Sequence, residues 1–279
     1  MRSGTNWVGN LLNLHPDIAC SGEYHLHRLF EGFDRISNPK KQPYGILMGS
    51  QLRLQATRDF ERLVRRLIEL GCNTLEKPQA TILGDRTPCL LNRIVIRNAK
   101  RIHIVRDGRD CLVSSTFHFL RMTGTEYPFE GFPEMQKVRE EFQANPDMFK
   151  EHPEQLLTQE SWVRLRIKRW SHRYRLDMKF AKRRKAQVFC TTYEKLHADT
   201  ENIRAQMYEF LGADAQKAEG LTDQTTAGFE KENVLSHYRK GKVGDWEKYF
   251  TPQVRQWFVE EGGQALRDAG YEKDDSWAT

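Results

Sequence analysis

The chain has 279 residues, and its 38% hydrophobic and 29% charged content suits one globular domain and excludes disordered and fibrous proteins. Its formal charge of +6 is compatible with an anionic partner, although a solvated basic surface would have the same composition. Five scattered cysteines without CxxC pairs, and histidines without an HExxH motif, exclude the common zinc motifs and predict reduced thiols in a cytoplasmic protein.

Two helices are predicted in the first quarter of the chain. The first begins near Trp7, because apolar residues up to Leu12 share one helical face before His15-Pro16 ends the pattern. The second shows apolar residues at i, i+3, i+4, i+7 and i+8 over residues 60–68. Gly71 is expected to end this second helix.

Short apolar stretches at residues 81–83, 102–105 and 188–190 alternate with helical segments, as buried parallel strands do. Residues 124–157 contain four prolines and little periodicity, which predicts a surface insertion or lid. A long helix is expected over residues 159–185. The pattern predicts an α/β fold in a single domain over residues 1–279, with a P-loop-like parallel sheet flanked by helices on both faces.

The opening segment, residues 2–7 (RSGTNW), places a cation, a glycine and two hydroxyls at the start of the first helix. Backbone N–H groups point outward at such a helix start, so the segment is a candidate anion cradle. The nucleoside-triphosphate motif GxxxxGK[ST] is absent. An ordinary Ser/Thr helix cap is the alternative interpretation.

Two other segments could hold an anion. Arg106 follows a predicted strand and Ser114 lies eight residues later, so both reach one anion only if the intervening helix packs back beside the strand. The loop at residues 237–246 (HYRKGKVGDW) combines three cations with two glycines and suits a phosphate. A surface cation and a solvated basic turn are the alternatives.

Four ordered segments, RSGTNW, RDGRDCLVSS, TTYEKL and YRKGKVGDWEKYFT, resemble those of the PAPS-dependent sulfotransferases, where PAPS is 3'-phosphoadenosine-5'-phosphosulfate. The resemblance covers residues 2 to about 251. It implies transfer of a sulfuryl group from PAPS, as cosubstrate, to a hydroxyl or amine by in-line displacement. Positioning and charge stabilisation would dominate such a reaction, by analogy with phosphoryl transfer.

The same resemblance implies a nucleotide site. It assigns the 5'-phosphosulfate to the first loop, the 3'-phosphate to the strand-helix motif and to the later basic loop, and the adenine to aromatic side chains. The implied residues are Arg2, Ser3, Gly4, Thr5, Asn6 and Trp7, then Arg106, Ser114, Tyr193, Phe229, Arg239, Lys240 and Gly241. For Tyr193 and Phe229, core packing is the alternative.

The acceptor side resembles the carbohydrate- and bacterial-type branch of the family. Gly22-Glu23-Tyr24-His25 resembles its catalytic glutamate segment, and Glu23 is expected to be the general base, with His25 as the competing candidate. In Gly84-Asp85-Arg86-Thr87-Pro88, the cation of Arg86 is expected to face the transferred sulfate. Arg2 and Arg86 would hold the sulfuryl oxygens without a metal. The alternatives are a Glu23 pair with Arg28 and a plain Asp85–Arg86 ion pair.

Partners and boundaries complete the expectations. We expect a small-molecule or carbohydrate acceptor, no nucleic acid and, because no apolar run of about 18 residues is present, no membrane span. A catalytically inactive PAPS-binding relative and a basic nucleic-acid-binding protein are the competing functions. Because a phosphate loop normally follows a strand, Met1 directly before Arg2 suggests a strand upstream of this sequence.

Overall fold

The computed structural model describes residues 3–37, 50–94, 96–122, 132–223, 225–226 and 241–279. Its strands are β1 (Ile18–Ser21), β2 (Ile82–Asp85), β3 (Arg101–Val105) and β4 (Val188–Thr192). Its α-helices are α1 (Thr5–Leu12), α2 (His27–Ser37), α3 (Ser50–Cys72), α4 (Gly108–Arg121), α5 (Pro133–Ala144), α6 (Met148–Glu151), α7 (Glu160–Arg183), α8 (Tyr193–Ala198), α9 (Thr200–Leu211) and α10 (Pro252–Asp268).

The described strands form two parallel pairs. β1 pairs with β2 and β3 pairs with β4, in registers that place Ser21 opposite Asp85 and Val105 opposite Thr192. The predicted α/β class with parallel strands is therefore confirmed, and its strands form two-stranded sheets within the described residues. β1 was not predicted, because its four residues are all buried and show no alternation that marks a strand.

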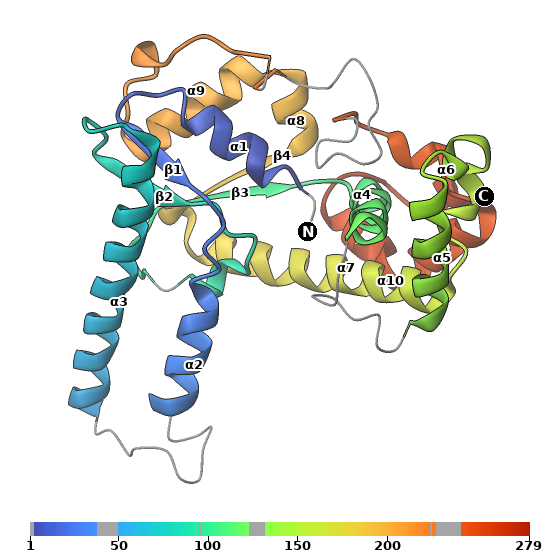
Figure 1. The fold of residues 1–279 in the computed structure, drawn as a ribbon, viewed down its shortest axis with the longest axis horizontal. Helices are drawn as coiled ribbons and strands as arrows, with labels where there is room; N and C mark the ends of the chain where they lie inside the picture. Colours follow the sequence, from blue (N-terminus) through green and yellow to red (C-terminus); the bar gives the residue numbers. More distant parts are fainter. Residues whose placement is uncertain (1–2, 38–49, 95, 123–131, 224, 227–240) are drawn as a thin grey trace.

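Helices cover the strands on two sides. Figure 1 shows α1, α8 and α9 on one side of β3 and β4 and α7 on the other. α1 packs against β1, α8 and α9 pack against β4, and α3 packs against both β1 and β2. This arrangement confirms helices on both faces and leaves the carboxyl ends of the strands available for a site.

The second predicted helix is longer than its apolar pattern, since α3 spans Ser50–Cys72. Gly71 does not end it: the helix continues to Cys72 and a short 3-10 helix, Asn73–Leu75, follows. A Cβ atom built on Gly71 would lie 2.1 Å from the hydroxyl oxygen of Tyr24. Gly71 therefore leaves room for the Tyr24 side chain beside α3 instead of ending the helix.

The prediction of a surface lid over residues 124–157 is wrong for its described part. Residues from 132 onward form α5, α6 and a 3-10 helix, Pro153–Gln155. Their apolar side chains, including Met135, Phe142 and Phe149, are buried in the largest core cluster together with side chains of α4, α7 and α10. Pro133 begins α5 and Pro153 begins the 3-10 helix, because a proline at the first helical position loses no hydrogen bond.

Two further findings concern the whole described chain. Among the described residues, no helix is both long and apolar enough to cross a membrane. All five cysteines are free thiols, and four of them are at least partly buried.

Candidate functional site

The first turn of α1 is open at its N-terminus. Its N-cap is Gly4, which adopts the left-handed conformation with φ 93°, and no side chain caps the helix. The alternative of an ordinary Ser/Thr cap is therefore not what the structure contains. A Cβ atom on Gly4 would lie 2.8 Å from the ring of Tyr193, so only glycine fits this loop.

Tyr193 is the residue where three of the predicted segments meet. Its ring packs edge-on against Trp7 with centroids 5.4 Å apart, and the guanidinium of Arg106 lies 4.3 Å from its centroid. Its hydroxyl donates a hydrogen bond to the carbonyl of Gly241 at 3.0 Å. The segment that begins α1, the strand-helix motif at Arg106 and the C-terminal loop at Gly241 therefore meet at one residue. About 100 residues of sequence separate the first segment from Arg106, and about 135 separate Arg106 from Gly241.

Trp7 is only 8% exposed, and its indole N–H donates to the carbonyl of Thr225 at 2.6 Å. It is part of a core cluster with α1, β1 and Tyr193. Stacking of Trp7 on adenine stays a prediction.

Arg106 emerges from the carboxyl end of β3, as expected. Its guanidinium donates to the carbonyl of Lys242 at 2.8 Å and lies 3.5 Å from the carboxylate of Asp110. Burial alone would lower the pKa of Arg106, but the neighbouring charges, Asp110 first among them, raise it. Nε of Arg106 is buried without a hydrogen-bond partner. The side chain is therefore charged, and one of its donors is unused.

Ser114 lies on α4, two turns beyond Arg106, and is half-buried. None of the recorded contacts among the described residues joins Ser114 to Arg106. Their shared anion stays a prediction.

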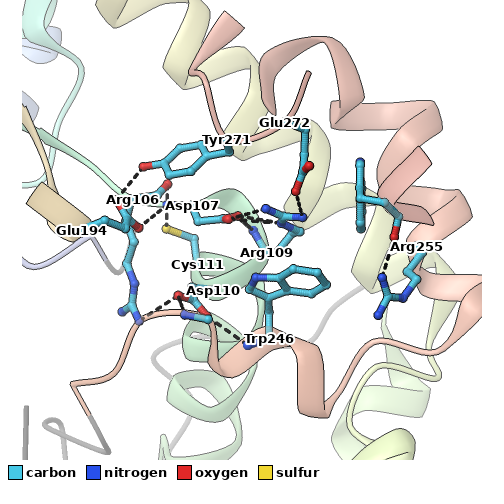
Figure 2. A network of polar contacts seen from close by, with 12 residues as sticks. Arg106, Asp107, Arg109, Asp110, Cys111, Glu194, Trp246, Arg255, Tyr271 and Glu272 are labelled. Carbon is cyan, nitrogen blue, oxygen red and sulfur yellow. Dashed lines mark hydrogen bonds and ion pairs between the residues drawn. The ribbon is translucent and has the colours of Figure 1, made fainter. Parts of the chain in front are cut away.

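Asp110 ties the C-terminal loop to α4 (Figure 2). Its carboxylate accepts backbone hydrogen bonds from Gly244 and from Trp246, both at 3.0 Å. Burial raises the pKa of Asp110, although Arg106 and the two backbone donors oppose this. Asp110 was not among the predicted site residues, although an acidic residue in the first turn of a helix inside a motif was a signal for it.

Glu194 has a similar connecting position on the other side of the strand-helix motif. Its carboxylate accepts from the backbone N–H of Asp107 at 3.0 Å and from the hydroxyl of Tyr271 at 2.8 Å. Asp107 in turn caps α4 and pairs with Arg109, whose guanidinium lies 4.0 Å from the Trp246 ring centroid. These contacts fix the start of α4, and with it the direction of Arg106.

The two predicted acceptor segments lie side by side because they follow the paired strands β1 and β2. The backbone N–H of Tyr24 donates to Asp85 at 3.3 Å, and that of His25 donates to the hydroxyl of Thr87 at 3.1 Å. Thr87 in turn donates to Asp85 at 2.6 Å. The segment that contains Glu23 is therefore positioned by the segment that contains Arg86.

Glu23 and His25 are close and accessible. Nε2 of His25 lies 3.8 Å from a carboxylate oxygen of Glu23, and the two side chains are 38% and 36% exposed. His25 has φ 52°, so the backbone is left-handed there. Its N–H bond to Thr87 helps to hold this strained conformation. Among the described contacts, none joins Glu23 to Arg28.

Arg86 lies along α1. It donates to Asn10 at 3.3 Å, and a Cβ atom on Gly9 would be 2.8 Å from its Cδ. Its Nε is buried without a partner. Asp85 accepts from Thr87 and Tyr24, and burial raises the pKa of Asp85, so the structure records no plain Asp85–Arg86 ion pair.

Ser3 is buried, and Thr5 and Asn6 are half-buried in the first turn of α1, where Oδ1 of Asn6 lacks a partner. Arg2, Phe229, Arg239 and Lys240 lie outside the described residues.

A family model described as a sulfotransferase domain matches residues 1–270. The 3-alpha-hydroxysteroid sulfotransferase of Cavia porcellus is 28% identical over 170 residues, which cover 55% of this chain and 51% of that protein. Sulfotransferase 1E1 of Rattus norvegicus is 24% identical over 291 residues, which cover 96% of this chain and 81% of that protein.

The chain thus spans about half the length of the first curated relatives it matches. Among solved structures, mouse sulfotransferase SULT7A1 complexed with PAP (3'-phosphoadenosine-5'-phosphate) is 19% identical to this chain, with a TM-score of 0.45. The match covers 96% of this chain and 82% of that one. Retinol dehydratase in complex with androsterone and PAP is 18% identical with a TM-score of 0.39, and that match covers 96% of this chain and 86% of that one.

Proposed function

The chain belongs to the sulfotransferase domain family, and from this premise we propose that it transfers a sulfuryl group from PAPS to a hydroxyl or amine of an acceptor. PAPS supplies a sulfuryl group that is activated by its bond to the 5'-phosphate. The observation that carries the proposal is the meeting of three segments at Tyr193, which contacts Gly4, Arg106 and Gly241.

The described residues fit a nucleotide with two anionic ends. The uncapped N-terminus of α1 offers backbone N–H groups and the positive end of a helix dipole, where an anion is stabilised. At the other anionic end, Arg106 offers a cation with an unused Nε donor. The unpartnered Oδ1 of Asn6, in the first turn of α1, can accept a hydrogen bond. Arg239 and Lys240, outside the described residues, would add charge near Gly241.

The acceptor would be activated at Glu23. Its exposed carboxylate can take a proton from an approaching hydroxyl or amine, and His25 at 3.8 Å can orient the acceptor or accept the proton instead. Arg86 would stabilise negative charge on the sulfuryl oxygens, since its Nε has no partner in the protein. The acceptor's identity and the choice of base belong to this proposal.

A comparison of two nucleotides tests the nucleotide site. 3'-Phosphoadenosine-5'-phosphate (PAP) should raise the thermal midpoint clearly more than adenosine 5'-phosphate, because Arg106, Ser114, Arg239 and Lys240 would bind the extra 3'-phosphate. Differential scanning fluorimetry at equal nucleotide concentrations measures the difference. Equal shifts from both nucleotides would contradict the assignment. Turnover with radiolabelled PAPS and a panel of acceptors then separates an enzyme from an inactive binder.

A further inference from the structure

The further inference concerns a cavity of about 380 Å³ between α4 and α7. α4 contributes Cys111, Leu112 and Ser115, and α7 contributes Trp170 and three arginines, Arg166, Arg169 and Arg173. The volume lies within the range of pockets that hold small organic ligands. The three arginines are at i, i+3 and i+7, so one face of α7 presents all of them.

Among the residues that the structure describes, these arginines have no acidic partner that would explain their grouping. Within the described part of the chain, no ion pair joins any of them to a carboxylate; Asp177 interacts with Arg173 only at longer range and is hydrogen-bonded to the backbone of Leu91. Nε of Arg166 is buried without a hydrogen-bond partner. Arg166 instead lies 4.9 Å from the ring centroid of Phe119.

The charges also repel one another. Burial, and after it the positive charges of Arg169 and Arg173, together lower the pKa of Arg166 to about 10. An anion in the cavity would relieve this repulsion and would use the free Nε donor.

The cavity reaches both halves of the site. Arg173 donates to the carbonyl of Pro88 at 3.1 Å, so one end adjoins the acceptor segment that contains Arg86. Trp170 donates to the carbonyl of Arg106 at 3.2 Å, so the other end adjoins the backbone of the nucleotide motif. The side chain of Arg106 itself contacts Lys242 and Asp110.

We propose that this cavity binds an anionic group of the acceptor, so that the acceptors of this protein carry a carboxylate, sulfate or phosphate besides the group that is sulfated. The proposal rests on the proposed function for the identity of the ligand as an acceptor. The cavity's affinity for an anion does not depend on it. A phosphate of the nucleotide is the other source of the same chemistry, and the experiment separates the two.

Phenyl phosphate and phenol, which differ by one phosphate, are the probes, and isothermal titration calorimetry is the measurement. With the protein saturated by PAP, phenyl phosphate should bind and phenol should bind far more weakly. Arg166→Gln and Arg169→Gln should each weaken phenyl phosphate about ten- to a hundredfold, the range for a lost charge-assisted hydrogen bond. Arg175→Gln, on the same helix but outside the cavity, should change it less than twofold.

The outcomes are distinct. Equal affinity in wild type, Arg166→Gln and Arg169→Gln, or no phenyl phosphate binding either with or without PAP, overturns the anion site. Binding of phenyl phosphate to the PAP-free protein that is lost on saturation with PAP overturns the acceptor assignment and gives the cavity to the nucleotide. Arginine-dependent binding in a protein that does not bind PAP keeps the anion site and overturns the proposed function. Arg169 is exposed, so its variant folds even if Arg166→Gln does not.

Discussion

Glu23 and His25 are neighbouring candidates for the general base, and separate variants can distinguish them. They are 3.8 Å apart on a turn whose shape depends on Asp85 and Thr87. The left-handed φ of 52° at His25 matters for the choice of variant, since asparagine tolerates this region better than alanine does. His25→Asn therefore removes the imidazole with the least disturbance of Glu23.

Glu23→Gln should lower turnover by about 10²- to 10⁴-fold, the usual contribution of a positioned base, and leave PAP affinity unchanged. His25→Asn should raise the acceptor KM more than it lowers kcat. Steady-state kinetics with PAPS measures both, and Glu31→Gln, an exposed glutamate that pairs with Arg93, is the matched control. Full turnover in Glu23→Gln together with its loss in His25→Asn would make histidine the base.

Asp177 is a buried acid whose charge costs stability. It is 2% exposed and accepts the backbone N–H of Leu91 at 2.7 Å. Burial raises its pKa from 3.8 to about 6. The folded protein therefore prefers the protonated acid, so its stabilising contribution is complete below pH 3.8 and is lost as the pH rises through 6.

Asp177→Asn should raise the free energy of unfolding at pH 7.5 by on the order of 1–3 kcal/mol, and this gain should vanish towards pH 4. The amide oxygen of asparagine can still accept from Leu91. Urea denaturation of variant and wild type at each pH is the measurement. The difference between the two proteins is the decisive quantity, because both contain His103. Burial lowers the pKa of His103 to about 4, so its contribution to the free energy of unfolding rises with pH, opposite to that of Asp177. A constant difference across this range would contradict the prediction.

At the scale of elements, the start of α4 and the loop from Gly241 to Trp246 form one unit. Asp110 accepts from Gly244 and Trp246 and pairs with Arg106, and Arg106 donates to Lys242. Their contact is what brings a cation and a loop to the same place.

Asp110→Asn should therefore impair the nucleotide site and the fold together. The buried Arg106 loses its charge partner, which costs about 3–5 kcal/mol of stability when a buried pair is broken. PAP affinity should fall by about tenfold or more, since Arg106 would form part of its site. Calorimetry of PAP binding and urea denaturation measure the two effects. Asp199→Asn, which changes an exposed helix cap on α9, should leave PAP affinity unchanged; equal losses in both variants would argue against a special function of Asp110.

At the scale of the whole molecule, the segment from α5 to Leu157 belongs to the core. Phe142 and Leu157 are fully buried, and they pack in one cluster with α4, α7 and α10. Figure 1 shows α5 and α6 beside α4, at the end of the molecule where the C-terminus lies. A lid that opens would leave this cluster exposed to water.

Phe142→Ala should lower the free energy of unfolding by about 3–5 kcal/mol, as large truncations in cores do. A residue of a mobile lid would change it by less than about 0.5 kcal/mol. Urea denaturation decides between these values. Leu63→Ala, at an exposed position on α3, is the control and should lie at the lower value.

The local features could be predicted from the sequence. Apolar periodicity located α1 and α3, apolar runs located β2, β3 and β4, a long helix was expected where α7 lies, and four ordered motifs indicated the family. These features depend on contacts between near neighbours or on residues that follow one another directly, so the linear pattern contains them. Gly4 was visible too, but the reason for it includes the ring of Tyr193, which is distant in the sequence.

Which distant residues meet depends on the packing of the elements against one another. Tyr193 joins segments from both ends of the chain, Asp110 fixes a loop more than 130 residues later, and three arginines of α7 face a cavity because α4 lies opposite them. The helices at residues 133–157 also became core only by packing against other elements. Burial and pairing arise from these long-range contacts, whose free energies no local pattern in the sequence encodes.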